Sequence, residues 1–148
     1  MSYKQKPLVS ADEQSKISRG VLSWLNLCPY NPDTRMSYEL LGDESGVALS
    51  TIQAAFKDAS YILGGYRAQY RFRVIYRIRP ETNNERLSAE ETVNNIGAWA
   101  EENANTLEID GVSVRAVRRD TVAALYARYE GGVEDYQILM TMTYEVNV

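Results

Sequence analysis

Histidine is absent from this chain of 148 residues, and cysteine occurs once. Without histidine there is no Ser-His-Asp or Cys-His triad, no histidine-based zinc site and no histidine general base. The single cysteine, Cys28, cannot form an intramolecular disulfide, which fits a reducing environment. No basic residue flanks it in Leu-Cys-Pro, so we expect a small buried apolar group and not a reactive thiol.

Long apolar runs and nucleotide-binding motifs are also missing. The first residues lead into no apolar stretch, so we expect no signal peptide, and no run of about 18 apolar residues could span a membrane. No Gly-Lys-Ser/Thr follows Gly64-Gly65, no GxGxxG pattern occurs, and the acids lack EF-hand spacing. We therefore expect no catalytic, cofactor-binding or metal-binding residues, no membrane contact and no enzymatic activity.

The remaining composition is typical of one globular domain. At this length folding buries roughly 70% of the unfolded chain's surface, and 45% of the residues are hydrophobic. We predict a single domain over residues 1–148, with residues 1–9 as a flexible leader. The net charge of −4 argues against an obligate duplex-DNA binder, although a local basic stripe can exist within an acidic total.

The segment Tyr66–Arg79 has the clearest pattern in the chain. Aromatic and β-branched residues occupy every second position from Tyr70 to Ile78, and arginines fall between them. Such period-2 alternation predicts a strand with one face on a core and the other in water. We expect it to be long, central, apolar below and basic above.

Two capping boxes predict two helices. Ser10 with Glu13 begins a helix from Ala11 to about Leu27, and Ser88 with Glu91 begins another from Ala89 to about Asn103. Apolar residues recur at helical spacing in both, so each has one buried stripe. Gly20 costs the first helix about 1 kcal/mol, which suggests close packing there.

Further strands complete an α+β fold. Val47–Phe56 suits a strand better than a helix, Tyr61–Leu63 continues the extended chain, and Asp110-Gly111 predicts a type I′ hairpin turn with positive φ at both residues. We predict an antiparallel or mixed β-sheet with an N-terminal helix and a second helix packed on one face. The other expected strands are Met36–Leu41, Val122–Tyr129 and Tyr136–Val146, whereas residues 115–120 are basic and unassigned.

The arginines of the Tyr66–Arg79 segment allow three interpretations. They can pair with acids of neighbouring strands, dock onto an acidic face of another subunit, or hold single-stranded nucleic acid with Tyr66 or Tyr70 as stacking platforms. The alternation counts against the third, because it puts rings and guanidinium groups on opposite faces. Our candidate subunit-interface residues are Arg71, Arg73, Arg77, Arg79 and Tyr66.

Several segments together resemble a known family. They are Tyr61–Tyr66, the alternating Tyr70–Arg77, the helical Ile96–Trp99, and the closing strand from Asp135 to Glu145. In this order they resemble the small minor capsid proteins of tailed bacteriophages, found in virions and in prophages of Gram-positive bacteria, a group that overlaps with tail-terminator (tail completion) proteins. The resemblance spans most of residues 10–147, and its motifs are structural.

The resemblance implies an oligomeric ring, usually a hexamer, that caps the tail tube and contacts the head connector. Its partners would be copies of itself, the tail-tube protein and the head-completion protein, with DNA only in transit through the pore. The protein would reside in the tail or neck of the virion, and in the host cytoplasm during assembly. The basic strand face could meet the acidic segment 81–110 of a neighbour. Another head–tail joining or minor capsid component, or a single-stranded nucleic-acid-binding sheet protein, stays open as an alternative.

Overall fold

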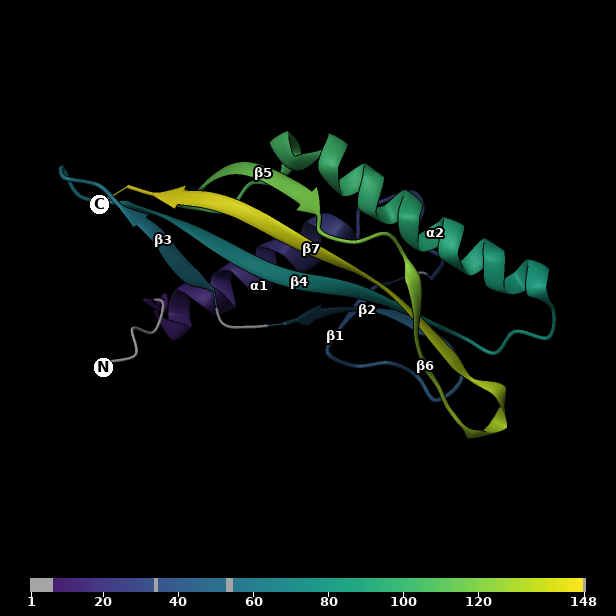
Figure 1. The fold of residues 1–148 in the computed structure, drawn as a ribbon. Helices are drawn as coiled ribbons and strands as arrows, with labels where there is room; N and C mark the ends of the chain where they lie inside the picture. Colours follow the sequence, from purple (N-terminus) through teal and green to yellow (C-terminus); the bar gives the residue numbers. More distant parts are fainter. Residues whose placement is uncertain (1–6, 34, 53–54, 148) are drawn as a thin grey trace, which may run out of the picture.

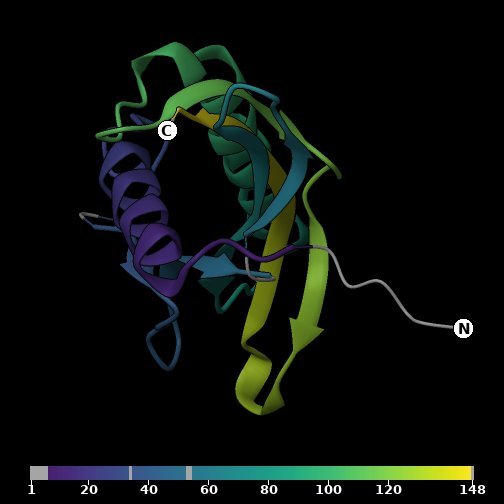
Figure 2. The same ribbon diagram turned by 90° about the vertical axis from the view of Figure 1, so that its left-hand side faces the viewer.

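A computed structural model of the chain describes residues 7–33, 35–52 and 55–147. It has the predicted α+β architecture: one mixed sheet with both helices on the same side of it (Figure 1, Figure 2). The helices are α1 (Ala11–Leu25) and α2 (Asn83–Glu102), and the strands are β1 (Ser37–Tyr38), β2 (Gly46–Thr51), β3 (Phe56–Ser60), β4 (Tyr66–Ile78), β5 (Ser113–Arg119), β6 (Ala124–Arg128) and β7 (Glu134–Val146).

The two longest strands form the centre of the sheet. β4 and β7 pair antiparallel over their full lengths, from Tyr66 opposite Val146 to Ile78 opposite Glu134. β2 and then β3 pair with the other edge of β4, and β5 and then β6 with the other edge of β7, while β1 is parallel to β2 (Figure 1). The C-terminal strand is therefore an interior strand of the sheet.

The alternation predicted for Tyr66–Arg79 is confirmed in β4. Tyr70, Phe72 and Val74 have no exposed surface and face the helices, as do Ile138 and Met140 of β7. The intervening arginines lie on the opposite side of the sheet, called the outer face below. Burying a large apolar side chain contributes about 1.5–3 kcal/mol, so this layer is a main source of stability.

The first helix follows its prediction closely. Ser10 Oγ accepts the backbone N–H of Glu13, and Ile17, Val21 and Leu25 are fully buried. A Cβ on Gly20 would lie 2.6 Å from Cγ1 of Ile109, so Gly20 does admit a close neighbour. Of the predicted leader, residues 7–9 pair with β3 through backbone hydrogen bonds, and residues 1–6 lie outside the described part.

The second helix begins six residues before its predicted start. Thr82, not Ser88, is the N-cap, and its Oγ1 accepts the backbone N–H of Glu85. Ser88 lies inside the helix, where its carbonyl accepts the hydroxyl of Thr92. The segments that begin at Thr82 and at Ser88 both have glutamate three residues after the threonine or serine, so both fit the capping-box motif. The residues between them are mostly polar and give no apolar pattern that would indicate the earlier start.

The strands before β4 differ from their predictions. The strand over Met36–Leu41 is reduced to β1. The segment Val47–Phe56 is divided between β2 and β3, with residues 53–54 outside the described part. Tyr61–Leu63 does not continue β3. It forms the turn into β4, in which Tyr61 N donates to Gly65 O and Gly64 N donates to Tyr61 O. Positive φ at Gly64 and Gly65 allows this reversal.

The later strands contain one confirmation, one correction and one addition. β6 confirms the strand predicted over 122–129. Asp110-Gly111 does form a two-residue turn between Ile109 and Val112, but only Gly111 has positive φ, as in a type II turn, so the type I′ prediction was wrong. The basic segment 115–120 contributes to β5, because pairing with β7 overrides its weak alternation.

Candidate functional site

Three arginines of the Tyr66–Arg79 segment pair with acids of their own chain. Arg67 bonds to Asp58 at 2.8 Å, Arg79 to Glu44 at 3.0 Å and Arg77 to Asp135 at 2.7 Å. Arg67, Arg79 and Glu44 are well exposed, and ion pairs with such exposed members contribute little to stability. The first interpretation of the arginines, pairing with neighbouring segments, therefore holds for these three side chains.

Arg77 belongs to the most enclosed pair of the outer face. Its Nε and Nη2 donate to the two oxygens of Asp135, whose side chain is 2% exposed, and its guanidinium lies 5.0 Å from the ring centre of Tyr129. The hydrogen bond and charge of Asp135 raise the pKa of Arg77. The hydroxyl of Tyr129 also donates to Asp135, and this bond raises the pKa of Tyr129.

Within the Tyr66–Arg79 segment, Arg71 and Arg73 are the arginines without an acidic partner among the described residues. Arg73 Nη1 donates to Gln137 at 3.3 Å, its guanidinium lies 5.1 Å from the ring centre of Tyr126, and its buried Nε has no acceptor in the described part of the chain. A hollow of about 250 Å³ beside it is also lined by Glu39. On the outer face the guanidinium groups at these two positions therefore form no ion pair with a described residue.

Tyr66, the fifth candidate, lies on the helix side of the sheet and away from the arginines. Its hydroxyl and that of Tyr144 both donate to the carboxylate of Glu13 in the first turn of α1. Burial and the bond to Glu13 raise the pKa of Tyr66 to about 12. The structure thus assigns Tyr66 to the attachment of α1 to the central strands.

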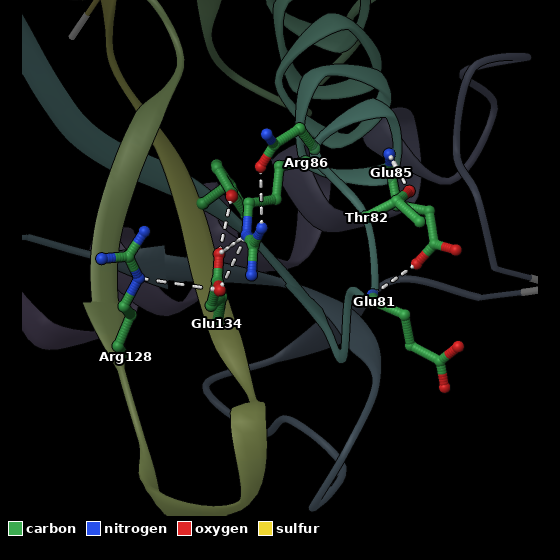
Figure 3. A network of polar contacts seen from close by, with 8 residues as sticks. Glu81, Thr82, Glu85, Arg86, Arg128 and Glu134 are labelled. Atoms are coloured by element: carbon green, nitrogen blue, oxygen red, sulfur yellow. Dashed lines mark hydrogen bonds and ion pairs between the residues drawn. The ribbon is translucent and has the colours of Figure 1, made fainter.

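A buried carboxylate joins α2 to β6 and β7 (Figure 3). Glu134, 3% exposed, accepts hydrogen bonds from Arg86 at 3.1 Å and from the hydroxyl of Tyr136 at 2.8 Å, and Arg128 lies 3.6 Å away. Burial alone would raise the pKa of Glu134, but the Tyr136 and Arg86 bonds hold it below its ordinary value of 4.5. All of these partners of the Glu134 carboxylate belong to the same chain. The network therefore holds α2, β6 and β7 together.

The turn between β3 and β4 presents apolar side chains to solvent. Ile62 and Leu63 are 102% and 96% exposed, and Tyr61 is 41% exposed. The turn projects at the end of the molecule near the C-terminus (Figure 1). Adjacent, fully exposed aliphatic residues on a projecting turn are typical of a contact surface. We call Tyr61, Ile62 and Leu63 the apolar tip.

A second apolar surface is a groove of about 630 Å³ along α1. Leu8, Val9, Leu22 and Tyr38 line it, with Arg19 as the one charged residue among its described lining residues. Among the described residues the side chain of Arg19 has no hydrogen-bond or ion-pair partner. We call this surface the α1 groove. Its size falls within the roughly 300–1,000 Å³ range of sites that hold ligand-sized groups.

In the described part of the chain no three His, Cys, Asp or Glu side chains gather as metal ligands, and no helix there is long and apolar enough to cross a bilayer. Comparison with protein-family models and with curated proteins finds no match.

Sequence reasoning found the arginines but missed two features that surround them. The sequence pattern predicts extended chain for residues 61–63, although two aliphatic residues before Gly-Gly are also consistent with an exposed turn. The rings of Tyr126 and Tyr129 lie over Arg73 and Arg77 only because β6 pairs with β7 in one particular register. No local pattern specifies that register.

Proposed function

We propose that the protein is a structural component of a tailed-bacteriophage tail or neck, most simply a tail terminator. Copies of the chain would form a ring that caps the tail tube and contacts the head connector, with no substrate turned over. The observation that carries the proposal is the apolar tip. Exposing its apolar side chains to water costs free energy, and contact with another protein would remove that cost.

The organisation of the molecule supports this function. The apolar tip and the α1 groove share no residues, so contacts between copies would be head-to-tail, the kind that closes into rings. The net charge of −4 suits a pore through which DNA passes without binding, since negative charge repels phosphate. Arg71 and Arg73 are available for acids of a neighbouring subunit or of the tail-tube protein.

Light scattering after size exclusion, combined with negative-stain imaging, tests the proposal. We expect the mass to rise with protein concentration toward a closed ring with a central channel, or rings to form on added tail tubes. A chain that stays monomeric at millimolar concentration and leaves tail tubes uncapped would contradict the proposal.

One observation favours a second candidate, a single-stranded nucleic-acid-binding protein. Tyr126 and Tyr129 bring aromatic rings, 49% and 45% exposed, to the same face as Arg71 and Arg73, so the separation of rings from guanidinium groups in β4 is no longer an objection. Fluorescence anisotropy with a labelled oligothymidine tests this. Binding that weakens steeply with added salt and is lost on Tyr126→Ala would support it, and no binding at low salt would exclude it.

A further inference from the structure

The backbone at the base of the apolar tip is closed by two hydrogen bonds. The bonds Tyr61 N–Gly65 O and Gly64 N–Tyr61 O, both 3.1 Å, close the turn, and a Cβ on Gly65 would lie 2.6 Å from the carbonyl oxygen of Val146. Gly65 at the base of the turn therefore lies close against the end of β7, and this contact reduces the backbone entropy that docking would cost. Ile62 and Leu63 extend beyond this anchored base.

The α1 groove complements the apolar tip in chemistry. Its lining is mainly aliphatic and aromatic, and Leu8, 62% exposed, extends the apolar surface at one end. Arg19 offers guanidinium donors that no described residue accepts. The carbonyls of Ile62 and Leu63 accept no backbone hydrogen bond within the described turn. The groove therefore offers hydrogen-bond donors and the tip offers acceptors.

We propose that the apolar tip of one copy docks into the α1 groove of the next, with Ile62 and Leu63 in the groove and Arg19 bonded to the carbonyls of the turn. The proposal rests on the assembly function above and names the surfaces that perform it. Because each copy offers one tip and one groove, the contact is head-to-tail and every subunit of a closed ring makes it twice.

The size of the contact determines how assembly proceeds. Three tip residues cover far less than the about 800 Å² per partner of a standard stable interface. A single tip–groove contact is therefore too small to hold a lasting dimer. Closing the ring makes the last contact intramolecular, so we expect rings to accumulate cooperatively above a threshold concentration, or on a template, with few intermediates.

Three variants test the contact in the full chain. Ile62→Asp/Leu63→Asp removes the tip, and Ser15→Arg fills the groove from an exposed position on α1. Leu87→Asp is the matched control, an exposed leucine on α2 outside both surfaces. We expect tip and groove variants to need at least about tenfold more protein to assemble than wild type, with unchanged melting temperature, and the control to assemble normally.

A cross-linking experiment covers the case in which the isolated protein stays monomeric. Leu63→Cys and Ser15→Cys chains, mixed and oxidised at high concentration, should form a mixed disulfide, whereas Leu87→Cys with Ser15→Cys should not. Rings that form normally in the tip variant would overturn the docking proposal and leave the assembly function standing. Absence of both assembly and the mixed disulfide would overturn both.

Discussion

Arg71 and Arg77 occupy equivalent positions on the outer face of β4, yet their surroundings differ. Arg77 is closed in by Asp135 and Tyr129, whereas Arg71 has no side-chain partner among the described residues. A charged pair that is mostly buried loses heavily when one member is removed, because the other charge stays desolvated. Arg71 is half-buried and has no charged partner in the described part of the chain, so its removal leaves no buried charge unpaired.

We therefore expect Arg77→Met to lower the free energy of unfolding by about 3–5 kcal/mol, since it strands a carboxylate that is 2% exposed. Arg71→Met, the matched control, should change it by less than about 0.5 kcal/mol. Urea unfolding followed by circular dichroism measures both. Equal losses of unfolding free energy in the two variants would mean that other groups supply the hydrogen bonds that Asp135 needs. Arg71, not Arg77, is thus the position at which charge reversal can test assembly without unfolding the subunit.

Glu134 links stability to pH. Its pKa is below the ordinary 4.5 in the fold, so the stabilisation is complete above that value and is lost as pH falls through the lower folded pKa. Glu134→Gln should cost about 3 kcal/mol at neutral pH. The difference between the variant and wild type should narrow below about pH 4. Unfolding free energies measured across that range would show the convergence, and parallel curves would contradict the assignment.

At the scale of elements, α2 shows which sequence signals are sufficient. Two cap sequences lie six residues apart, and both fit the same motif. The choice between them depends on the first turns of α2 being held to β7 through Arg86 and Glu134. That contact joins residues 48 positions apart, so no window of local sequence contains it.

Paired alanine substitutions test the start of the helix. Thr82→Ala should lower the free energy of unfolding by about 1 kcal/mol, because it removes the acceptor of the Glu85 N–H. Ser88→Ala should be neutral or slightly stabilising, since alanine is the better helix former in an interior position. Thermal unfolding of the two variants beside wild type gives the comparison. A larger loss of unfolding free energy for Ser88→Ala than for Thr82→Ala would indicate that Ser88 is the N-cap and that the helix is shorter.

Strands with one buried face along their whole length are predictable from sequence, and strands that depend on a neighbouring edge are not. β4 and β7 alternate strictly because each has a buried face and a wet face along thirteen residues, and that pattern is visible in the sequence. β1 and β5 are short or mostly exposed, and their existence depends on the edge to which they pair. The candidate arginines followed from the β4 pattern, whereas the apolar tip and the tyrosines over Arg73 and Arg77 depend on turn geometry and register.

At the scale of the whole molecule, the decisive pairing joins strands far apart in sequence. Tyr66 lies opposite Val146, and thirteen such pairs hold the centre of the sheet together. Non-local pairing makes folding slow, because the loop must close before contacts compensate its entropy. The intervening α2, β5 and β6 cannot pack fully until this ladder exists.

We expect refolding from urea to take milliseconds to seconds and not microseconds. Stopped-flow fluorescence of Trp24 and Trp99, whose ring centres lie 5.1 Å apart, reports formation of the layer between the helices. Ile138→Val, in the middle of β7, should cost about 1 kcal/mol. Most of this loss should appear as slower refolding. Faster unfolding alone would mean that the ladder forms after the rate-limiting step.

The interior position of β7 has a consequence during synthesis. About 70 residues separate the end of β4 from the end of β7. At roughly 5–20 residues per second a ribosome needs several seconds to add them, and β4 meanwhile exposes an unpaired edge and bare aromatic rings. During this time the nascent chain exposes surface that is prone to aggregation. The complete sheet exists only after β7 has emerged.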